Sequence, residues 1–237
     1  MIHEPERQAL DGNLDEARRR NVEPVARLIE ALRADPAMRL TFVSTTCVAG
    51  NKKGLFTEFD HDCGQRFYNA YDRSLFEAEG LLRASDVRSR VTIVRRCFLL
   101  DDGPLASLTA MLAGRRPVVI AADPRAELHA ITSAEFAEAL ASIAANPAAM
   151  GKTLHVVTGF SPSRRAEARP TSIRELVDAA RRGPVWFLPP ALAPLAWALR
   201  ALTLGFVRAF PAPGSGLGPY LRHRTAFDDF QARQLVT

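Results

Sequence analysis

Short β-branched runs alternate with segments of helical period along most of the chain, and this alternation constrains the fold more than any other feature. Apolar runs at residues 40–48, 90–95, 117–121 and 153–157 predict strands that are buried on both faces of a parallel sheet. Segments of helical period at residues 13–34, 71–83, 105–112, 134–144 and 172–181 predict helices. Strands and helices that alternate in this order indicate an α/β fold with a mainly parallel sheet.

The first two predicted elements are the most clearly delimited. Asn13 followed three residues later by Glu16 is typical of a helix start, and the apolar period continues to Ala34, before Asp35-Pro36 ends it. We therefore expect one long helix over residues 13–34. The strand at 40–48 carries no charge and closes at Gly50, and residues 50–64 are expected to form a loop.

Composition places the chain among ordinary globular proteins. It has 237 residues, 47% hydrophobic and 24% charged, so a fibrous or disordered chain is excluded. The net charge of +5 comes almost entirely from arginine, in short groups with acids between them and without interleaved aromatic residues. Nucleic-acid surfaces usually combine basic stripes with stacking aromatics, so we expect no nucleic-acid partner.

The cysteines and histidines do not suggest a metal or disulfide site. Cys47, Cys63 and Cys97 are odd in number, far apart and without a Cys-x-x-Cys spacing. The five histidines show no ligand pairing. This usage predicts free thiols in a reducing compartment and no metal site, and the absence of an apolar leader after Met1 favours a cytoplasmic protein.

An apolar segment at residues 188–210 requires a separate interpretation. Four large side chains repeat on a helical stripe: Leu195, Leu199, Leu202 and Phe206. Three prolines and two arginines interrupt the segment, so we expect no membrane span. The stripe is predicted to be core or the wall of an acyl pocket, and a helix on a membrane surface is the alternative.

Residues 44–82 carry a resemblance to a known family. The stretch "STTCVAGNKKGLFTEFDHDCGQRFYNAYDRSLFEAEGLL" resembles the extended short-chain dehydrogenase/reductases, within them the thioester reductase and fatty acyl-CoA reductase (male-sterility-type) branch. The matching positions are Ser44, Thr45, Gly50, Gly54, Glu58, Phe67, Asn69, Tyr71, Ser74, Glu77, Ala78 and Glu79. Weaker similarity at 151–159 and 219–229 extends it over most of the chain.

The resemblance implies a partial Rossmann-like parallel sheet with flanking helices and a C-terminal helical substrate-pocket region. Residues 1–112 would be the remnant of the Rossmann-like core, and residues 113–237 a substrate-domain-like region interwoven with the sheet. It also implies that Thr45 hydrogen-bonds a substrate carbonyl and that Tyr71 is the general acid. Ser44, Thr45, Tyr71 and Cys97 are then the candidate substrate-binding residues.

The sequence departs from the family pattern at the residue that should assist the tyrosine. The family has a lysine four residues after the tyrosine, which lowers its pKa and holds the nicotinamide ribose, whereas this chain has Leu75. An unassisted tyrosine has a pKa of about 10, far from that of an efficient general acid. Lys52 or Lys53, in the predicted loop 50–64, would be a poor replacement for that lysine. Thr45 and Tyr71 are therefore predicted to be vestigial catalytic residues.

Two further departures affect the cofactor site. No glycine-rich turn precedes Asn13, and the glycine-rich stretch at 213–218 follows no predicted strand. Where the branch has Arg-Pro-Ser, this chain has Arg95-Arg96-Cys97. We therefore expect an N-terminally shortened, degenerate member that binds no cofactor alone, and NADP only if a partner supplies the missing half.

These observations lead to one functional hypothesis and two alternatives. The hypothesis is a binding or partner subunit near acyl-thioester or lipid metabolism, with an acyl thioester as the candidate ligand. The alternatives are one half of a split NAD(P)H-dependent acyl-thioester or carbonyl reductase, and a cofactor-free acyl-binding enzyme that reuses Thr45 and Tyr71. If four strands are missing, the strand 40–48 becomes a sheet edge, which predicts a homo- or hetero-oligomer through that strand.

Overall fold

The computed structural model describes residues 1–5, 13–161, 164–165, 170–211, 219–220 and 225–236. The chain divides into two compact units, each built from separate stretches of sequence. Unit 1 comprises Met1–Cys97, Ala134–Ala168 and Thr225–Thr237, and unit 2 comprises Phe98–Ser133 and Arg169–Arg224. The boundary predicted at residue 112 therefore lies inside unit 2. The glycine-rich stretch at 213–218 lies outside the described residues.

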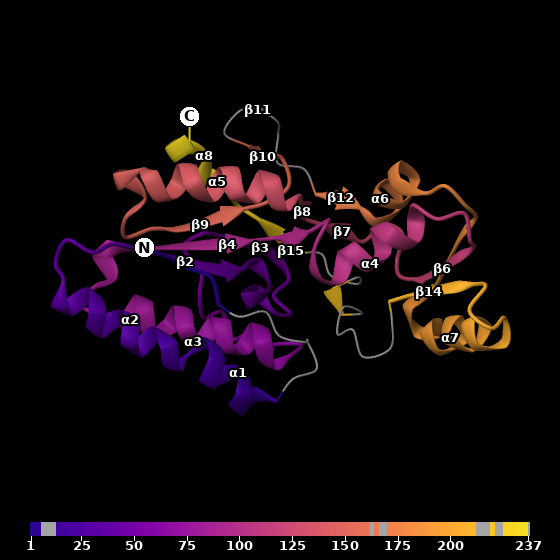
Figure 1. Ribbon diagram of the computed structural model, residues 1–237, viewed down its shortest axis with the longest axis horizontal. Coiled ribbons are helices and arrows are strands. Elements are labelled where there is room, and N and C mark those ends of the chain that lie inside the picture. The colour runs from indigo at the N-terminus through magenta and orange to yellow at the C-terminus, as the bar shows by residue number, and fades with distance from the viewer. Residues whose placement is uncertain (6–12, 162–163, 166–169, 212–218, 221–224, 237) are drawn as a thin grey trace. The chain divides into compact units, whose positions relative to one another are not determined.

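Unit 1 is built on a four-stranded parallel sheet in the order β1-β2-β4-β9. The strands are β1 (Ile2–His3), β2 (Leu40–Thr45), β4 (Val91–Arg96) and β9 (Thr153–Val156). Helices α1, α2 and α3 lie on one side of this sheet and α5 on the other (Figure 1). The predicted α/β class with a parallel sheet is confirmed.

The remaining elements of unit 1 cover the sheet and its edges. Its helices are α1 (Leu14–Asn21), α2 (Glu23–Ala34), α3 (Ala70–Ala84), α5 (Ser133–Ala145) and α8 (Phe230–Val236). Three 3-10 turns are η1 (Thr46–Ala49), η2 (Arg88–Arg90) and η3 (Pro147–Ala149). Strand β3 (Gly54–Phe56) pairs with β15 (Thr225–Phe227), and β10 (Phe160–Ser161) pairs with β11 (Arg164–Arg165).

The single helix predicted over residues 13–34 is wrong in one respect, because the chain forms two helices that meet at Val22. Pro24 stands in the first turn of α2 and has no N–H to continue the hydrogen bonding of α1. The Val22 N–H still bonds the Arg18 carbonyl and the Val25 N–H bonds Val22. The helical period is nevertheless preserved, so both helices bury their apolar faces.

The prediction of an uncovered strand over residues 40–48 also needs correction. Strand β2 ends at Thr45, and the chain turns into η1. The two-residue strand β1 pairs in parallel with Thr41 and Phe42, so β2 is an inner strand there. Strand β3 lies within the predicted loop 50–64. Strands of two or three residues are too short to give a periodic signal.

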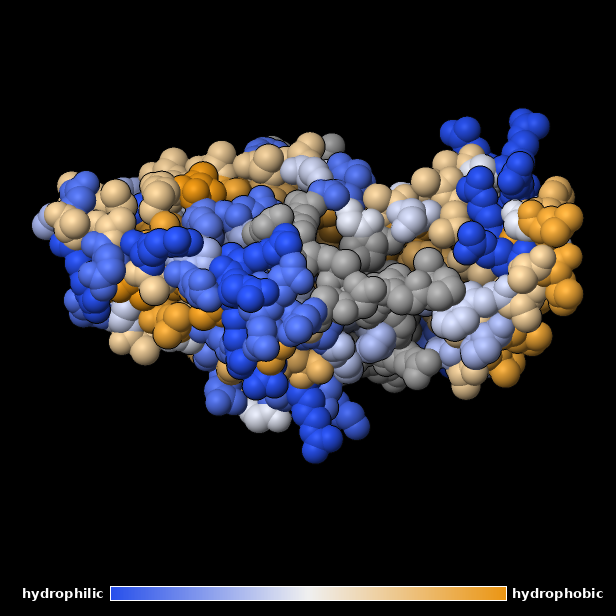
Figure 2. Space-filling model, turned by 60° about the horizontal axis from the view of Figure 1, so that its bottom comes forward, coloured by the Kyte–Doolittle hydropathy of each residue, from blue (hydrophilic) through white to orange (hydrophobic). Residues whose placement is uncertain are grey.

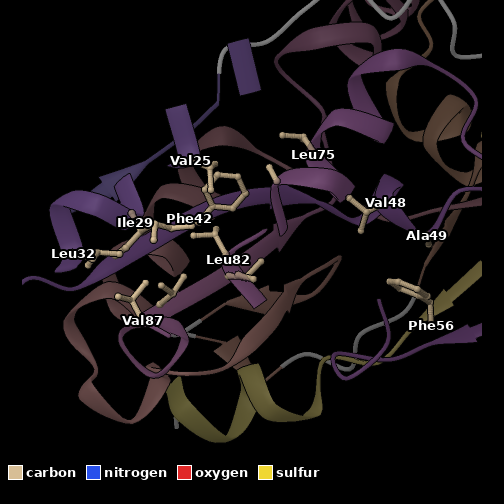
Figure 3. Close-up of a cluster of buried hydrophobic side chains, with 14 residues drawn as sticks. Val25, Ile29, Leu32, Phe42, Val48, Ala49, Phe56, Leu75, Leu82 and Val87 are labelled. Atoms are coloured by element: carbon tan, nitrogen blue, oxygen red, sulfur yellow. The ribbon is translucent and has the colours of Figure 1, made fainter. Parts of the chain in front are cut away.

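The core of unit 1 lies between the sheet and α1–α3. Its fully buried side chains come from helices and strands together, and Figure 3 shows Val25, Phe42, Leu75 and Leu82 within it. Burying each large apolar side chain contributes roughly 1.5–3 kcal/mol. This packing holds α3 against β2, and with it the residues at the start of α3.

Unit 2 contains a smaller parallel sheet in the order β13-β6-β14. Its elements are β5 (Phe98–Leu99), α4 (Gly103–Leu112), β6 (Val118–Ala121), β7 (Glu127–Leu128), β8 (Ala130–Ile131), β12 (Thr171–Ser172), α6 (Ile173–Ala180), β13 (Val185–Leu188), η4 (Pro190–Leu192), α7 (Ala193–Leu202) and β14 (Arg208–Phe210). Strands β5 and β8 pair in parallel, and β7 and β12 antiparallel. A buried face of α7 packs on β6 and β14.

The structure corrects the interpretation of the stripe on α7. Leu195, Leu199, Leu202 and Phe206 are exposed and are not part of a core. The contacts of α7 come instead from Ala196 and Trp197, which lie on its opposite side and pack against Val119 and Ala209. Among the described residues, no helix has the length and apolarity that crossing a membrane requires.

Candidate functional site

Polar side chains from four segments meet at the carboxyl edge of the unit 1 sheet. Strand β2 ends at Thr45, β4 ends at Arg96, and Glu4 follows β1. Tyr71 lies in the first turn of α3, and the charges of Arg96 and Glu4 both act on its pKa. The carboxyl ends of parallel strands are the usual ligand-binding edge in open α/β sheets. Arg96 is a neighbour of both predicted residues, because it pairs with Thr45 across the strands and its charge acts on Tyr71. The joint action of Thr45 and Tyr71 on one substrate stays a prediction.

The start of α3 is fixed by side-chain hydrogen bonds. Asn69 caps the helix, because its Oδ1 accepts the Asp72 N–H at 2.8 Å and its Nδ2 donates to the buried Asp72 carboxyl at 2.9 Å. Asn21 of α1 donates to the Ser74 hydroxyl at 2.9 Å, and Ser74 donates to the Tyr71 carbonyl at 2.8 Å. The position of Tyr71 is therefore set by α1 as well as by α3.

Tyr71 retains its proton strongly. Burial raises its pKa to about 12, and the charge of Arg96 opposes this rise while Asp72, Cys47 and Glu4 reinforce it. A hydroxyl with this pKa donates a hydrogen bond well at neutral pH. It transfers its proton poorly.

Arg96 is the cation of this site, and the sequence analysis treated it only as a change in a loop. Its side chain is 13% exposed, its Nε lies 3.7 Å from Glu4 Oε1, and its guanidinium lies over the Phe136 ring at 6.0 Å. The charge of Arg96 lowers the pKa of Tyr71. Arg96 ends β4, and β4 lies beside β2, which ends at Thr45. The position of an arginine at the end of a predicted strand is the signal that could have identified it.

The other side chains at this edge are less available. Thr45 Oγ1 accepts the Cys47 N–H at 3.2 Å and begins η1. Burial raises the pKa of the Cys47 thiol well above its ordinary value, and Asp72 adds to the rise. Cys97 is 2% exposed, and burial strongly raises the pKa of its thiol. Both thiols are therefore held in the protonated, weakly nucleophilic form. Binding of substrate by Cys97 stays a prediction.

Ser44 has a different environment from Thr45. Side chains alternate along a strand, so neighbouring residues point to opposite faces of the sheet. The Ser44 hydroxyl donates to Glu79 Oε1 at 2.5 Å, and Glu79 forms a buried ion pair with Arg95, whose Nη2 lies 2.7 Å from Oε2. The structure therefore does not bring Ser44 together with Thr45 and Tyr71. Its role as a substrate contact stays a prediction.

Glu58, another residue of the family pattern, has a structural role. It is 1% exposed and accepts backbone N–H groups from His155 at 2.9 Å, Gln231 at 2.7 Å and Ala232 at 3.1 Å. Burial raises its pKa to about 7, although these three N–H donors act in the opposite direction. Glu58 thereby joins β9 to the first turn of α8.

The residue at the position of the family lysine does not fit a nicotinamide cofactor. Leu75 is 1% exposed and belongs to the apolar cluster with Val25 and Phe42 (Figure 3). It offers no charge or hydrogen bond to a ribose. Within the part of the chain that the structure describes, no group of His, Cys, Asp and Glu side chains could hold a metal ion.

Solved structures with a similar fold include proteins that were solved in complex with NAD. The terminal R domain from the myxalamid PKS-NRPS biosynthetic pathway is 18% identical with a TM-score of 0.68, covering 98% of this chain and 60% of that one. MoeE5 in complex with UDP-glucuronic acid and NAD is 19% identical with a TM-score of 0.61 (99% and 71% covered). A nucleoside-diphosphate-sugar epimerase from Staphylococcus aureus is 17% identical with a TM-score of 0.59 (99% and 71%).

These identities show the Rossmann-type fold alone, and the chain spans 60% of the length of the R domain. No curated protein sequence is significantly similar to the chain. Residues 2–122, which include the whole β2–α3–β4 site, match an NAD-binding family described as "Male sterility protein". The match covers more than half of the sequence and agrees with the motif at residues 44–82, so the chain belongs to the male sterility family.

Proposed function

We propose that the chain is a binding protein that holds the carbonyl group of an acyl thioester at the carboxyl edge of β2 and β4 and does not reduce it. The observation that carries this proposal is the burial of Leu75 in the apolar core at the position of the family lysine. Burial raises the pKa of Tyr71 to about 12, and Leu75 offers no group that could hold a nicotinamide ribose.

The chemistry of the site suits recognition of a carbonyl oxygen. The hydroxyls of Thr45 and Tyr71 are hydrogen-bond donors from two rigid elements, β2 and α3. Arg96 adds a positive charge that stabilises the partial negative charge of the oxygen. The resemblance to thioester reductases supports a thioester as the source of that carbonyl. The proposal does not include the family's NAD(P) chemistry, because Leu75 replaces the lysine that would hold the nicotinamide ribose.

The test is a binding titration of the full chain with octanoyl-coenzyme A. We expect saturable binding that weakens at least ~10-fold in Tyr71→Phe and in Thr45→Val, because each loses one donated hydrogen bond to a buried acceptor. Tyr220→Phe in unit 2 is the matched control and should bind as the native chain does. Saturable NADPH binding with thioester-dependent NADPH oxidation would overturn the proposal.

A second candidate is one part of a two-part NADPH-dependent reductase, and Arg96 is the observation that favours it. A cation beside Tyr71 lowers the pKa of that tyrosine, as the missing lysine would. The test is to purify this chain from its native cells together with any bound partner. This candidate predicts that the assembly oxidises NADPH in the presence of an acyl thioester. Tyr71→Phe and Arg96→Gln should each abolish that activity. An assembly that binds thioester without oxidising NADPH favours the first proposal.

A further inference from the structure

Most of a long stretch of sequence without acidic residues belongs to unit 2. Residues 179–227 include no Asp or Glu, and the six arginines of this stretch are Arg181, Arg182, Arg200, Arg208, Arg222 and Arg224. A chain that is 24% charged would ordinarily mix both signs over such a length. This stretch includes β13, α7 and β14.

The same stretch exposes large apolar side chains on one contiguous segment, here named the α7 face. Its members extend from η4 through α7 to the turn before β14: Leu192, Leu195, Leu199, Leu202, Leu204 and Phe206. Leu202 is 83% exposed, Leu204 96% and Phe206 60%. Figure 2 shows a hydrophobic area beside strongly hydrophilic residues at the right end of that view, where Figure 1 places α7. Contiguous exposed apolar residues mark interaction sites.

The Leu204 side chain, in the turn at the tip of the α7 face, buries almost no apolar surface on folding. Leu204 adopts a φ of 50°, a left-handed conformation that non-glycine residues rarely take, and it is almost fully exposed. A leucine here is therefore unfavourable for the folded chain in water. Its side chain gains apolar contact only when something covers it.

Arginines lie at the same edge of the unit 2 sheet as this turn. The strands β13, β6 and β14 are parallel and start in register at Val185, Val118 and Arg208. The residues at and just before these starts therefore share the amino edge. Four of them are arginines, here named the arginine edge: Arg115, Arg116, Arg182 and Arg208. Backbone bonds from Arg182 to Leu112 and from Arg208 to Pro117 hold these segments together. Within the described residues, none of the four forms an ion pair.

We propose that the α7 face and the arginine edge together bind the surface of an anionic lipid bilayer. Leu202, Leu204 and Phe206 enter the interface between headgroups and acyl chains, and the arginines contact lipid phosphates. Interfacial segments combine an apolar face of Leu, Phe and Trp with flanking cations in this manner. Binding lies in the plane of the surface, because α7 has only ten residues.

The charge of the stretch favours an anionic bilayer over a second copy of the chain as the binding partner. A second copy would bring the same arginines to the contact and would repel them, since the stretch carries no acids to pair with them. An anionic bilayer supplies both an apolar medium for the leucines and negative charge for the arginines. The inference is independent of the carbonyl site, because all of its residues belong to unit 2.

The test is flotation of the full chain with vesicles of phosphatidylcholine, with and without phosphatidylserine. We expect binding only to the vesicles that contain phosphatidylserine, and weaker binding as salt is raised. The variant Leu202→Ser, Leu204→Asn, Phe206→Ser should bind at least ~10-fold more weakly, since it removes the inserting side chains. Asn suits the left-handed position of Leu204, so this variant keeps the turn.

Matched controls use exposed residues of unit 1. Leu55→Thr with Phe59→Ser removes two exposed apolar side chains of unit 1 and should leave binding unchanged. Arg115→Glu with Arg116→Glu should abolish binding, whereas Arg19→Glu with Arg27→Glu on α1 and α2 should weaken it far less. Failure to bind phosphatidylserine vesicles, or full binding by the Leu202, Leu204 and Phe206 variant, overturns the proposal. So does a dimer in sedimentation that this variant converts to monomer.

Discussion

Arg96 and Leu75 reverse the arrangement of charge that the family pattern implies around Tyr71. The pattern puts the cation on α3, four residues after the tyrosine, whereas here α3 contributes an apolar side chain and β4 contributes the cation. Arginine keeps its charge at any physiological pH and binds oxygen atoms through a rigid fork of donors. The site is thereby better suited to holding an oxygen atom than to exchanging a proton.

Leu75→Lys should not create a reductase. The ammonium group would enter the cluster that contains Val25 and Phe42, so we expect the free energy of unfolding to fall by about 2 kcal/mol or more. Chemical denaturation measures this loss, and Leu75→Met, which conserves volume, should cost less than about 1.5 kcal/mol. NADPH oxidation by the lysine variant with an acyl thioester would contradict the prediction.

Arg95 should be among the most sensitive positions of unit 1. Burial alone would raise the pKa of Glu79, but Arg95 and the Ser44 hydroxyl keep that pKa below its ordinary value. Arg95→Met leaves Glu79 without its main partner and should lower the free energy of unfolding by about 3–5 kcal/mol.

The companion variants of Arg95 separate ion pairing from packing. Arg95→Met with Glu79→Leu should recover much of the loss, because the fully buried carboxylate that lost its main partner is then absent. Arg33→Met removes the exposed ion pair with Asp86 and should lower the free energy of unfolding far less than Arg95→Met, because solvent screens the exposed pair. Equal losses in Arg95→Met and Arg33→Met, measured by urea denaturation, would be inconsistent with this account.

At the scale of elements, most of unit 1 follows from periodicity, and the errors have physical causes. The strands β2, β4 and β9 are long enough to show a continuous apolar run, and the helix α3 is long enough to show a period of about 3.6 residues. The two-residue β1 is recognised only by its partner β2, which lies far along the chain. Thr45 and Tyr71 could be predicted from the motif, whereas Arg96 required knowing that β4 ends beside β2.

The contact of Glu58 with α8 and β9 predicts a dependence of stability on pH. The folded pKa of about 7 lies above the ordinary value of 4.5, so the folded chain binds this proton more tightly than the unfolded chain. The tighter binding of this proton adds up to about 3 kcal/mol to the free energy of unfolding. This stabilisation is full below about pH 4.5 and is lost as pH rises through about 7.

Glu58→Gln should remove that contribution. Denaturation of both proteins at about pH 5 and about pH 8 measures it, and the loss between the two pH values should be smaller in the variant than in the native chain. Burial also raises the pKa of Asp229. Asp229 is present in both proteins, so its effect on stability cancels in the comparison. Identical pH profiles would show that Glu58 does not titrate in this range.

At the scale of the whole molecule, the outer strand of the unit 1 sheet is where we propose self-association or a partner chain. Strand β1 covers only Thr41 and Phe42 of β2, and within the described residues it forms one edge of the sheet while β9 forms the other. Partly covered apolar strands favour pairing with another chain. We expect an oligomer at micromolar concentration. A monomer in sedimentation, with slow amide exchange from Phe42 to Thr45, would refute this.

The order of synthesis sets when unit 1 can be completed. The chain passes between the two units four times, at residues 97/98, 133/134, 168/169 and 224/225. The backbone donors that satisfy Glu58 include Gln231 and Ala232, which leave the ribosome after all of unit 2. Until then Glu58 lacks two of its three backbone N–H donors. The packing of α8 against β9 is therefore completed only after all of unit 2 has been synthesised, and unit 2 has the opportunity to fold first.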